Sequence, residues 1–349
     1  MLTPPEGLRG PQPDNQTLTI PRKDADMTLS ERLLPFEVRF TIAFLAVTLA
    51  LGHWLGVQLI MPGPDQADFI GIHYLYPLVG LALWAAVLTF FSKQNPGPVI
   101  LVALPCYALV MLAHFNIKLW VPDINPRLHD QDYYQIDLAL RPLVDGAIAV
   151  RRSLNFLIPP DSPFYSHGFI AMFYFGFTVH AMQRTEVFRA LVIAAITLQA
   201  FGALGYLIAP AVGPFVFEQG TNSFFTSVQQ GMLASYQAHL AQGPSWVAAN
   251  GQAMLLTGLG AMPSLHAGGS FLFVIFAWRH CRWVTPIPLA MCAFLCIAAI
   301  ANRWHYLIDL PVGMLLAWGC AMLGEKVVGI RAPHRETQQA QPELQPLPA

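Results

Sequence analysis

Long runs of apolar residues alternate with short polar segments over most of the chain. Each run is about 20 residues long, which is the length that a helix needs to cross a bilayer. The two runs that least clearly predict a transmembrane helix are 166–182 and 285–302, whose lengths are near the lower limit for crossing a membrane. The pattern predicts an all-α integral membrane protein with about eight transmembrane helices. The runs cover about residues 38–60, 74–92, 98–121, 166–182, 187–209, 263–280, 285–302 and 305–324.

The composition excludes several other classes of protein. Of 349 residues, 55% are hydrophobic and 11% are charged, whereas a soluble domain has about 25% charged residues. Lys and Arg number 19 against 20 Asp and Glu, so no basic excess is available to bind nucleic acid. The five cysteines form no CxxC pair and lie in or beside apolar runs, which argues against a disulfide scaffold.

Both ends of the chain are polar. Residues 1–35 are rich in proline and 326–349 in glutamine and proline, and we expect two disordered cytoplasmic tails. No apolar segment near the start has the form of a cleaved signal peptide.

The positions of the cationic residues predict the orientation in the membrane, because Lys and Arg concentrate in cytoplasmic loops. The segments 61–73 and 210–262 contain neither Lys nor Arg, and we assign them to the outer side. Both termini are then cytoplasmic. We expect a bacterial inner membrane, so that any site on the outer side faces the periplasm; in a eukaryotic host the outer side would face a lumen. The cations of the opposite loops are Lys93, Arg184, Arg189, Arg279 and Arg282.

The segment 130–158 is too charged to cross a membrane, yet its apolar positions recur every three or four residues. This spacing predicts a helix in the outer interface, broken near Pro142. The helix could simply lie among the lipid headgroups. Alternatively Arg141, Arg151 or Arg152 binds an anionic headgroup, because a guanidinium matches phosphate geometry.

Candidate chemistry is concentrated in two short segments. Residues 260–267 open the sixth run with Pro263, which suits a first helical position, and Ser264. The free N–H groups of such a helix start can bind an anion. Residues 302–309 join the last two runs, and His305 and Asp309 are four residues apart, so on a helix they share one face. A carboxylate on one imidazole nitrogen leaves the other nitrogen nucleophilic.

The two segments should meet near the outer face. The sixth run descends about 27 Å over 18 residues, and the seventh returns by about the same length. His266 and His305 therefore lie at a similar depth. A metal site made from these histidines and Asp309 is conceivable.

The sequences PSLHA at 263–267 and HYLID at 305–309 resemble two motifs of the type 2 phosphatidic acid phosphatase superfamily. They look most like the branch that contains inositol phosphorylceramide synthases, and sphingomyelin synthases have a similar HYxxD element. The resemblance covers about 200–325 and more weakly 98–200. It implies a six-helix catalytic core at 98–325, preceded by two extra transmembrane helices at 36–97.

The resemblance also implies roles for individual residues. His305 would attack phosphorus and become a phosphohistidine, and Asp309 would orient it. His266 would protonate the departing alkoxide and later deprotonate the acceptor. Arg303, Ser264 and the backbone N–H groups after Pro263 would stabilise charge on the phosphoryl oxygens. No metal or other cofactor is implied.

The chain departs from the superfamily at its first motif, KxxxxxxRP, which we expect just before the long loop 210–262. The fifth run ends in residues 206–215 with neither Lys nor Arg. We interpret Arg141-Pro142 as a chance match to the end of that motif. The interfacial arginines Arg141, Arg151 and Arg152 are our candidates to supply the missing cations.

Three functional hypotheses remain. The first is an enzyme that cleaves the headgroup phosphoester or phosphodiester of a membrane phospholipid or sphingolipid. A small alcohol as acceptor would make it a phosphotransferase, and water would make it a phosphatase. The second is a transporter, which should carry ionisable residues at the bilayer midplane. The third is a catalytically silent lipid-binding protein, in which His266 and His305 would lie far apart.

Overall fold

The computed structural model describes residues 34–62, 75–160, 162, 164–255 and 260–330. The elements described below belong to one compact unit that begins at Phe36. Over the described residues the secondary structure is helical throughout, with no strand. The protein is therefore an all-α membrane protein. The predicted tails fall almost wholly outside the described residues, although the last helix extends into the second of them and ends at Val328.

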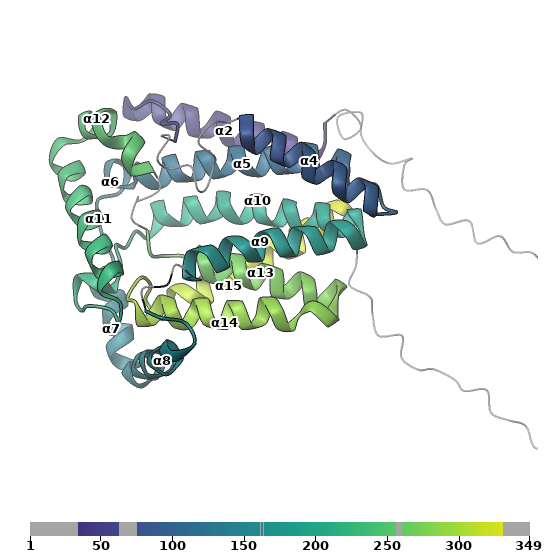
Figure 1. Cartoon of the computed structure of the whole chain (residues 1–349). Coiled ribbons are helices and arrows are strands. Elements are labelled where there is room, and N and C mark those ends of the chain that lie inside the picture. Colours follow the sequence, from purple (N-terminus) through teal and green to yellow (C-terminus); the bar gives the residue numbers. More distant parts are fainter. Residues whose placement is uncertain (1–33, 63–74, 161, 163, 256–259, 331–349) are drawn as a thin grey trace, which may run out of the picture. The chain divides into compact units, whose positions relative to one another are not determined.

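Eight long helices correspond to the eight apolar runs (Figure 1). By length and composition α2, α5, α10 and α15 can each cross a membrane, and α14 is a shorter apolar helix. The bounds are α2 Phe36–Leu55, α4 Leu75–Phe91, α5 Gly97–Leu119, α9 Phe164–Gln183, α10 Thr185–Ile208, α13 Leu265–His280, α14 Pro286–Ala301 and α15 Asp309–Val328.

Several helix boundaries differ by a few residues from those of the apolar runs. Helix α2 ends at Leu55 rather than at residue 60, because Gly56 adopts a left-handed φ of 70°, the usual conformation just after a helix. Helix α15 begins at Asp309 rather than at residue 305. His305 therefore lies in the loop between α14 and α15, which has its own hydrogen bonds.

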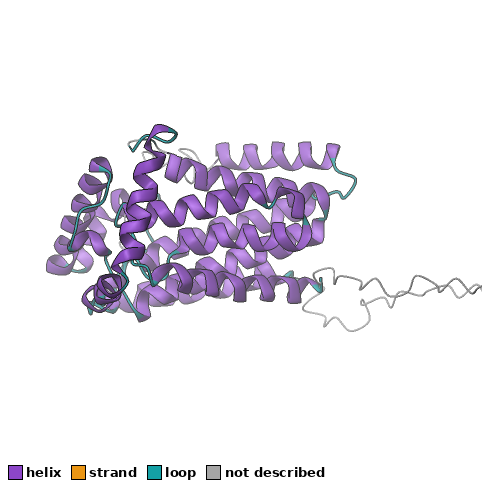
Figure 2. Ribbon diagram, turned by 90° about the horizontal axis from the view of Figure 1, so that it is seen from below, coloured by secondary structure: helices purple, strands orange, loops and turns teal. Residues whose placement is uncertain are grey.

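Helix α10 packs against α5, α9, α13 and α15. Nearly all its side chains from Val187 to Ala200 are buried, in agreement with a helix that is apolar on every face. Figure 2 shows the long helices running alongside one another.

The two ends of the helix bundle differ. At one end, which we call the turn end, short connections at 92–96, 184 and 281–285 join successive helices. At the opposite end, the site end, the connections contain further helices, which lie on the left of Figure 1. They are α6 Val121–Ile124, α7 Asp130–Ala139, α8 Arg141–Ser153, α11 Ser223–Gln242 and α12 Pro244–Met254.

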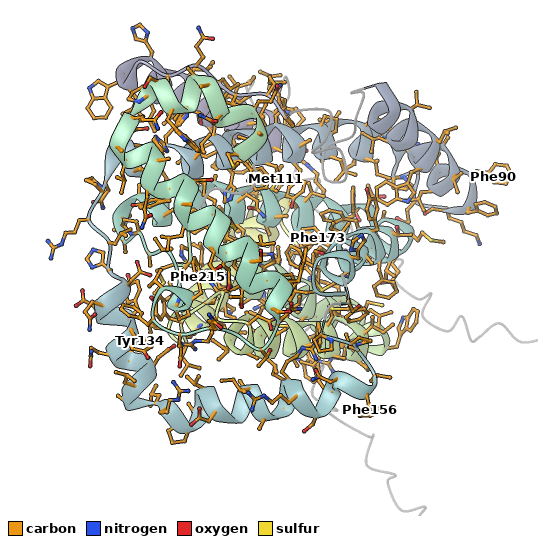
Figure 3. All side chains as sticks on the ribbon, turned by 60° about the vertical axis from the view of Figure 1, so that its left-hand side comes forward. Phe90, Met111, Tyr134, Phe156, Phe173 and Phe215 are labelled. Atoms are coloured by element: carbon orange, nitrogen blue, oxygen red, sulfur yellow. The ribbon has the colours of Figure 1, made fainter. Side chains whose placement is uncertain are left out.

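The segment 130–158 is helical, with a break at Leu140 between α7 and α8. Pro142 is the second residue of α8, where a missing N–H costs nothing. Val144 is buried, whereas Leu143 and Phe156 are exposed, and Phe156 is labelled at one edge of Figure 3. An interfacial position of this segment in the membrane stays a prediction.

The long loop 210–262 contains α11 and α12. Asn222 caps α11 by accepting a hydrogen bond from the Phe225 N–H at 3.1 Å. Near the other end of α11, Nε2 of His239 lies 2.7 Å from a carboxylate oxygen of Asp123 in α6. The second contact fastens α11 to α6 at the site end.

Candidate active site

The imidazole of His305 is oriented by two acceptors on the same nitrogen. Its Nδ1 lies 2.9 Å from the carbonyl oxygen of Ala261 and 3.2 Å from Oδ2 of Asp309. Since the carbonyl oxygen of Ala261 can only accept, Nδ1 carries the proton of the neutral ring. The other nitrogen, Nε2, then holds a lone pair that can act as a base or a nucleophile.

Asp309 has two structural roles. Its Oδ2 also accepts the Tyr306 N–H at 2.8 Å, which closes the first turn before α15. Its Oδ1 is buried without a hydrogen-bond partner in the structure. Asp309 therefore both begins a helix and orients His305.

Burial keeps His305 neutral. Burial lowers the pKa of His305 to about 4, and the positive charge of Lys118 adds to this, while the hydrogen bond to Ala261 opposes it. A neutral imidazole is the form in which Nε2 can attack an electrophile.

His266 is the second residue of α13, and its ring packs among aromatic side chains. The centroid of the His266 ring lies 4.8 Å from the ring of Phe169 and 5.2 Å from that of Tyr165. It lies 6.1 Å from the ring of His305. The two histidines, 39 positions apart in the chain, thus face one small volume.

The start of α13 is fastened to the start of α15. The Ser264 N–H donates to the Asp309 carbonyl oxygen at 3.1 Å, and Oγ of Ser264 accepts from the Ala267 N–H at 3.3 Å. Ser264 is fully buried. Its hydroxyl oxygen thus serves as the helix cap, and two of the N–H groups considered for anion binding are already used within the fold.

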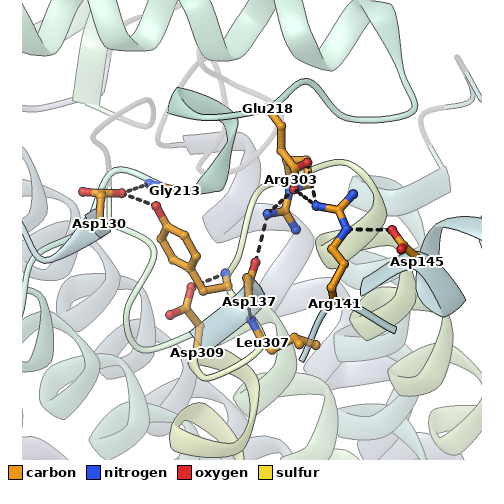
Figure 4. A network of polar contacts seen from close by, with 10 residues as sticks. Asp130, Asp137, Arg141, Asp145, Gly213, Glu218, Arg303, Leu307 and Asp309 are labelled. Atoms are coloured by element: carbon orange, nitrogen blue, oxygen red, sulfur yellow. Dashed lines mark hydrogen bonds and ion pairs between the residues drawn. The ribbon is translucent and has the colours of Figure 1, made fainter. Parts of the chain in front are cut away.

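Arg303 is fully buried beside this site (Figure 4). Its Nη2 lies 2.9 Å from Oδ2 of Asp137 and 2.6 Å from Oε1 of Glu218. Its Nε and Nη1 are buried without a partner in the structure. Buried donors without a partner are costly, so this face of the guanidinium is suited to an anionic ligand.

The three interfacial arginines occupy different environments. Arg141 pairs with Glu218 and Asp145 at 2.8 Å each, and the hydrogen bond to Glu218 raises the pKa of Arg141. Arg141 is therefore linked to Arg303 through Glu218, which pairs with both arginines. A phosphate-binding role for these arginines stays a prediction.

Arg151 and Arg152 have no such link to Arg303. Nη1 of Arg151 donates to Asn155 at 2.7 Å and to the carbonyl oxygen of Ile158 at 3.2 Å. Arg151 thus closes the turn after α8. Arg152 is exposed.

A cation that the sequence analysis missed lies close to the histidines. Nζ of Lys118, near the end of α5, stands 5.4 Å from the ring centroid of Tyr206. The Lys118 stem lies so close to Gly260 that an added Cβ there would be 3.1 Å from Cε. Gly260 directly precedes Ala261, the residue that holds His305.

A signal in the sequence could have identified Lys118. It is followed by six residues and then by Asn125-Pro126, which is the spacing of KxxxxxxRP with asparagine in place of arginine. This match lies at the end of the third apolar run, whereas we expected the motif at the end of the fifth run. Asn125 donates to the Leu207 carbonyl oxygen at 2.9 Å, so it fastens α10 to the segment after α5.

The described part of the chain has no group of three or more His, Cys, Asp and Glu side chains placed to hold a metal ion. Of the three residues considered for such a site, His305 and Asp309 are joined to one another through Nδ1 and Oδ2.

The fold and this site define a membrane protein in which two histidine rings lie close together, with a buried arginine in the same loop as His305 and a lysine whose charge acts on His305. Residues 161–323 match the family model of the PAP2 superfamily, a span that contains His266, Arg303, His305 and Asp309. The match indicates an activity of the phosphatase and phosphotransferase type on lipid phosphates. No curated protein and no solved structure matches the chain.

Proposed function

We propose that this protein is a lipid phosphotransferase or phosphatase that works through a phosphohistidine at His305. The proposal is carried by the orientation of His305: Nδ1 is held by Ala261 and Asp309, which leaves Nε2 free on the side of the ring away from them. His266 lies 6.1 Å away, centroid to centroid, close enough for one phosphoryl group to contact both rings.

In the first step, Nε2 of His305 attacks the phosphorus of the lipid headgroup and forms an N–P bond. The bond between phosphorus and the leaving oxygen breaks, and protonated His266 gives its proton to that oxygen. Asp309 stabilises the positive charge that develops on His305 through its contact with Nδ1. General acid help of this kind is worth about 10²–10⁴-fold.

In the second step, neutral His266 takes a proton from the hydroxyl group of the acceptor. The acceptor oxygen then bonds to phosphorus, the N–P bond breaks and His305 returns to its neutral form. From a phosphomonoester lipid, water as acceptor gives free phosphate and an alcohol gives a new phosphomonoester. From a phosphodiester lipid, water gives a phosphomonoester and an alcohol gives a new phosphodiester.

Two cations are candidates to stabilise the phosphoryl oxygens. Arg303 offers Nε and Nη1, which have no partner in the structure, and Lys118 offers a charge that acts on His305. Ser264 contributes less directly, because its oxygen already caps α13. Preorganised charges around a developing oxyanion are usually a large part of catalysis.

We favour the transferase form, resembling an inositolphosphotransferase with a small alcohol as acceptor. The support is the cover over the site: α11 contacts the His305 loop through Phe225, whose ring lies 5.9 Å from that of Trp304, and through Gln229, which donates to the Asn302 carbonyl oxygen at 2.9 Å. A covered site restricts water and so favours transfer over hydrolysis.

We place the site end on the periplasmic side of a bacterial inner membrane, with both termini cytoplasmic. The support is the charge of the turn end, whose connections contain Lys93, Arg184 and Arg282, as cytoplasmic loops commonly do. We further propose that 98–325 is the catalytic core and that the helices at 36–97 are an addition to it.

The deciding experiment incubates the purified protein in detergent with a panel of phosphorus-labelled phospholipids and sphingolipids, with and without inositol. We expect acid-labile label on the wild-type protein and none on His305→Ala. His53→Ala serves as the control, because His53 is an exposed histidine near the end of α2. Label that persists in His305→Ala would contradict the proposal, and the released product distinguishes transferase from phosphatase.

A further inference from the structure

Two buried aspartates of α7 contact the loop that carries His305 (Figure 4). Asp130 and Asp137 are seven residues apart, about two helical turns, and therefore share one face of α7. Both are buried, Asp137 with only 1% of its side chain exposed. Aspartates are almost never so buried unless they are paired. Helix α7 also lies before the 161–323 family match.

Asp137 connects the residues on both sides of His305. Its Oδ2 accepts from Nη2 of Arg303 at 2.9 Å, and its Oδ1 accepts the Leu307 N–H at 2.9 Å. One carboxylate therefore bridges the two flanks of the loop. A shift of either flank would break a hydrogen bond to a charged group, which is stronger than a neutral one.

Asp130 fixes the residue next to His305. Its Oδ1 accepts the Tyr306 hydroxyl at 2.7 Å, and the same carboxylate accepts the N–H groups of Val212 and Gly213 at 2.8 to 3.0 Å. Tyr306 is thereby joined to the segment that follows α10. The adjacent Ala211 carbonyl oxygen accepts the N–H of Ala261, the residue that holds Nδ1 of His305.

The backbone conformation of Arg303 gives a second reason for its ion pairs with Asp137 and Glu218. Its φ is 57°, and its N–H and that of Trp304 donate to the carbonyl oxygens of Ile300 and Ala299. This is the helix ending in which glycine is normally found. An arginine held in this left-handed conformation needs compensating contacts, and the ion pairs with Asp137 and Glu218 supply them.

We propose that Asp137 and Asp130 are positioning residues, which hold the loop of His305 from the outer side and aim its Nε2. Helix α7 is then part of the active site rather than a helix that only lies at the lipid headgroups. This inference rests on the proposed function, because aiming Nε2 matters for catalysis only if His305 is the nucleophile.

The test compares Asp137→Asn with Asp132→Asn in the purified full-length protein. The amide introduced by Asp137→Asn keeps an oxygen for the Leu307 N–H but loses the charge that faces Arg303. Asp132 lies on the same helix, and its side chain is 74% exposed, so its substitution controls for the loss of one negative charge. Tyr306→Phe, which removes one hydroxyl group, is the milder second variant if Asp137→Asn does not fold.

Two readouts are needed. The first is turnover of the labelled lipid: we expect kcat to fall about 10²-fold at an almost unchanged KM, since misplacement by about 1 Å can cost this much. Asp137→Glu, which keeps the charge, should recover part of the loss. If Asp137 had a purely structural role, Asp137→Asn would lower the yield and the unfolding temperature but leave kcat per folded molecule unchanged.

The second readout does not depend on activity. The rate at which diethyl pyrocarbonate modifies His305, followed by mass spectrometry, should rise about tenfold in Asp137→Asn, because a lost hydrogen bond to a charged group makes local opening easier. A wild-type modification rate and a wild-type kcat in both Asp137→Asn and Tyr306→Phe would overturn the inference. If the wild type itself shows neither turnover nor label, the proposed function fails, and the modification rates still decide whether α7 holds the loop.

Discussion

The ring centroids of His266 and His305 lie 6.1 Å apart because the starts of α13 and α15 meet at glycine. A Cβ atom on Gly313 would stand 2.1 Å from the carbonyl oxygen of Ser264, and one on Gly268 would stand 2.6 Å from the carbonyl oxygen of Gly313. Glycine permits this approach because it has no Cβ.

Gly313→Ala should therefore disturb the site as well as the fold. The added methyl group would meet backbone, which cannot move aside as a flexible side chain can, and overpacking of this kind costs about 1–3 kcal/mol or more. We expect a lower unfolding temperature in detergent and a loss of lipid turnover. Gly319→Ala, on the same helix with nothing within 4 Å of the added atom, should behave like the wild type. A Gly313→Ala protein with wild-type stability and activity would show that the helix contact is looser than described.

Lys118 should contribute to phosphate binding and transition-state stabilisation. We expect Lys118→Met to lower kcat/KM for the labelled lipid about 10²-fold, the usual effect of removing one group that stabilises an oxyanion. Lys118→Arg should retain more activity because it keeps the charge. Lys93→Met, an exposed lysine at the turn end, is the matched control. Equal activity of Lys118→Met and Lys93→Met would exclude this role.

Three of the four predicted phosphate-binding arginines should behave differently from one another when each is changed to lysine. Arg303→Lys should lose most activity, because a lysine offers no planar fork to contact both Asp137 and a phosphate. Arg151→Lys should mainly lower the unfolding temperature, since Arg151 donates to the turn after α8. Arg152→Lys should change neither quantity, because this side chain is exposed. Steady-state kinetics and thermal unfolding of the three variants, measured side by side, check these three expected outcomes.

His305 should make stability depend on pH between about 4 and 6.5. Its pKa in the folded protein is lowered to about 4 by burial, whereas an unperturbed histidine has a pKa of about 6.5. As the pH falls through this window, the unfolded chain binds a proton that the folded chain does not, so the free energy of unfolding decreases. The decrease from this residue is about 3 kcal/mol at most.

His305→Gln removes this proton uptake, so its unfolding temperature should fall less steeply than that of the wild type between pH 6.5 and 4. Thermal unfolding at several pH values checks the difference between the two proteins, in which the contributions of the other histidines cancel. Parallel curves would mean that His305 titrates normally in the folded protein.

The sequence determined the helices and the residues that carry the motif. Apolar runs of sufficient length can bury their backbone polar groups in a bilayer only as helices, so all eight helices followed from the order of apolar residues. The pairing of His305 with Asp309 was also local, since four residues separate them. The helix expected there was not found, and the contact is made in a loop that ends at the first residue of α15.

Only the tertiary structure decided which distant groups join this pair. Lys118, Asp137 and Glu218 belong to segments that the sequence presented as a helix end, an interfacial helix and a nearly uncharged loop. Lys118 lies against Tyr206 near the end of α10, whereas Asp137 and Glu218 pair with Arg303 in the loop after α14. A carboxylate or guanidinium buried there is stable only beside an opposite charge. Hydrophobic periodicity reports which side of a helix is buried, and it carries no information about which polar groups from other helices will be its neighbours.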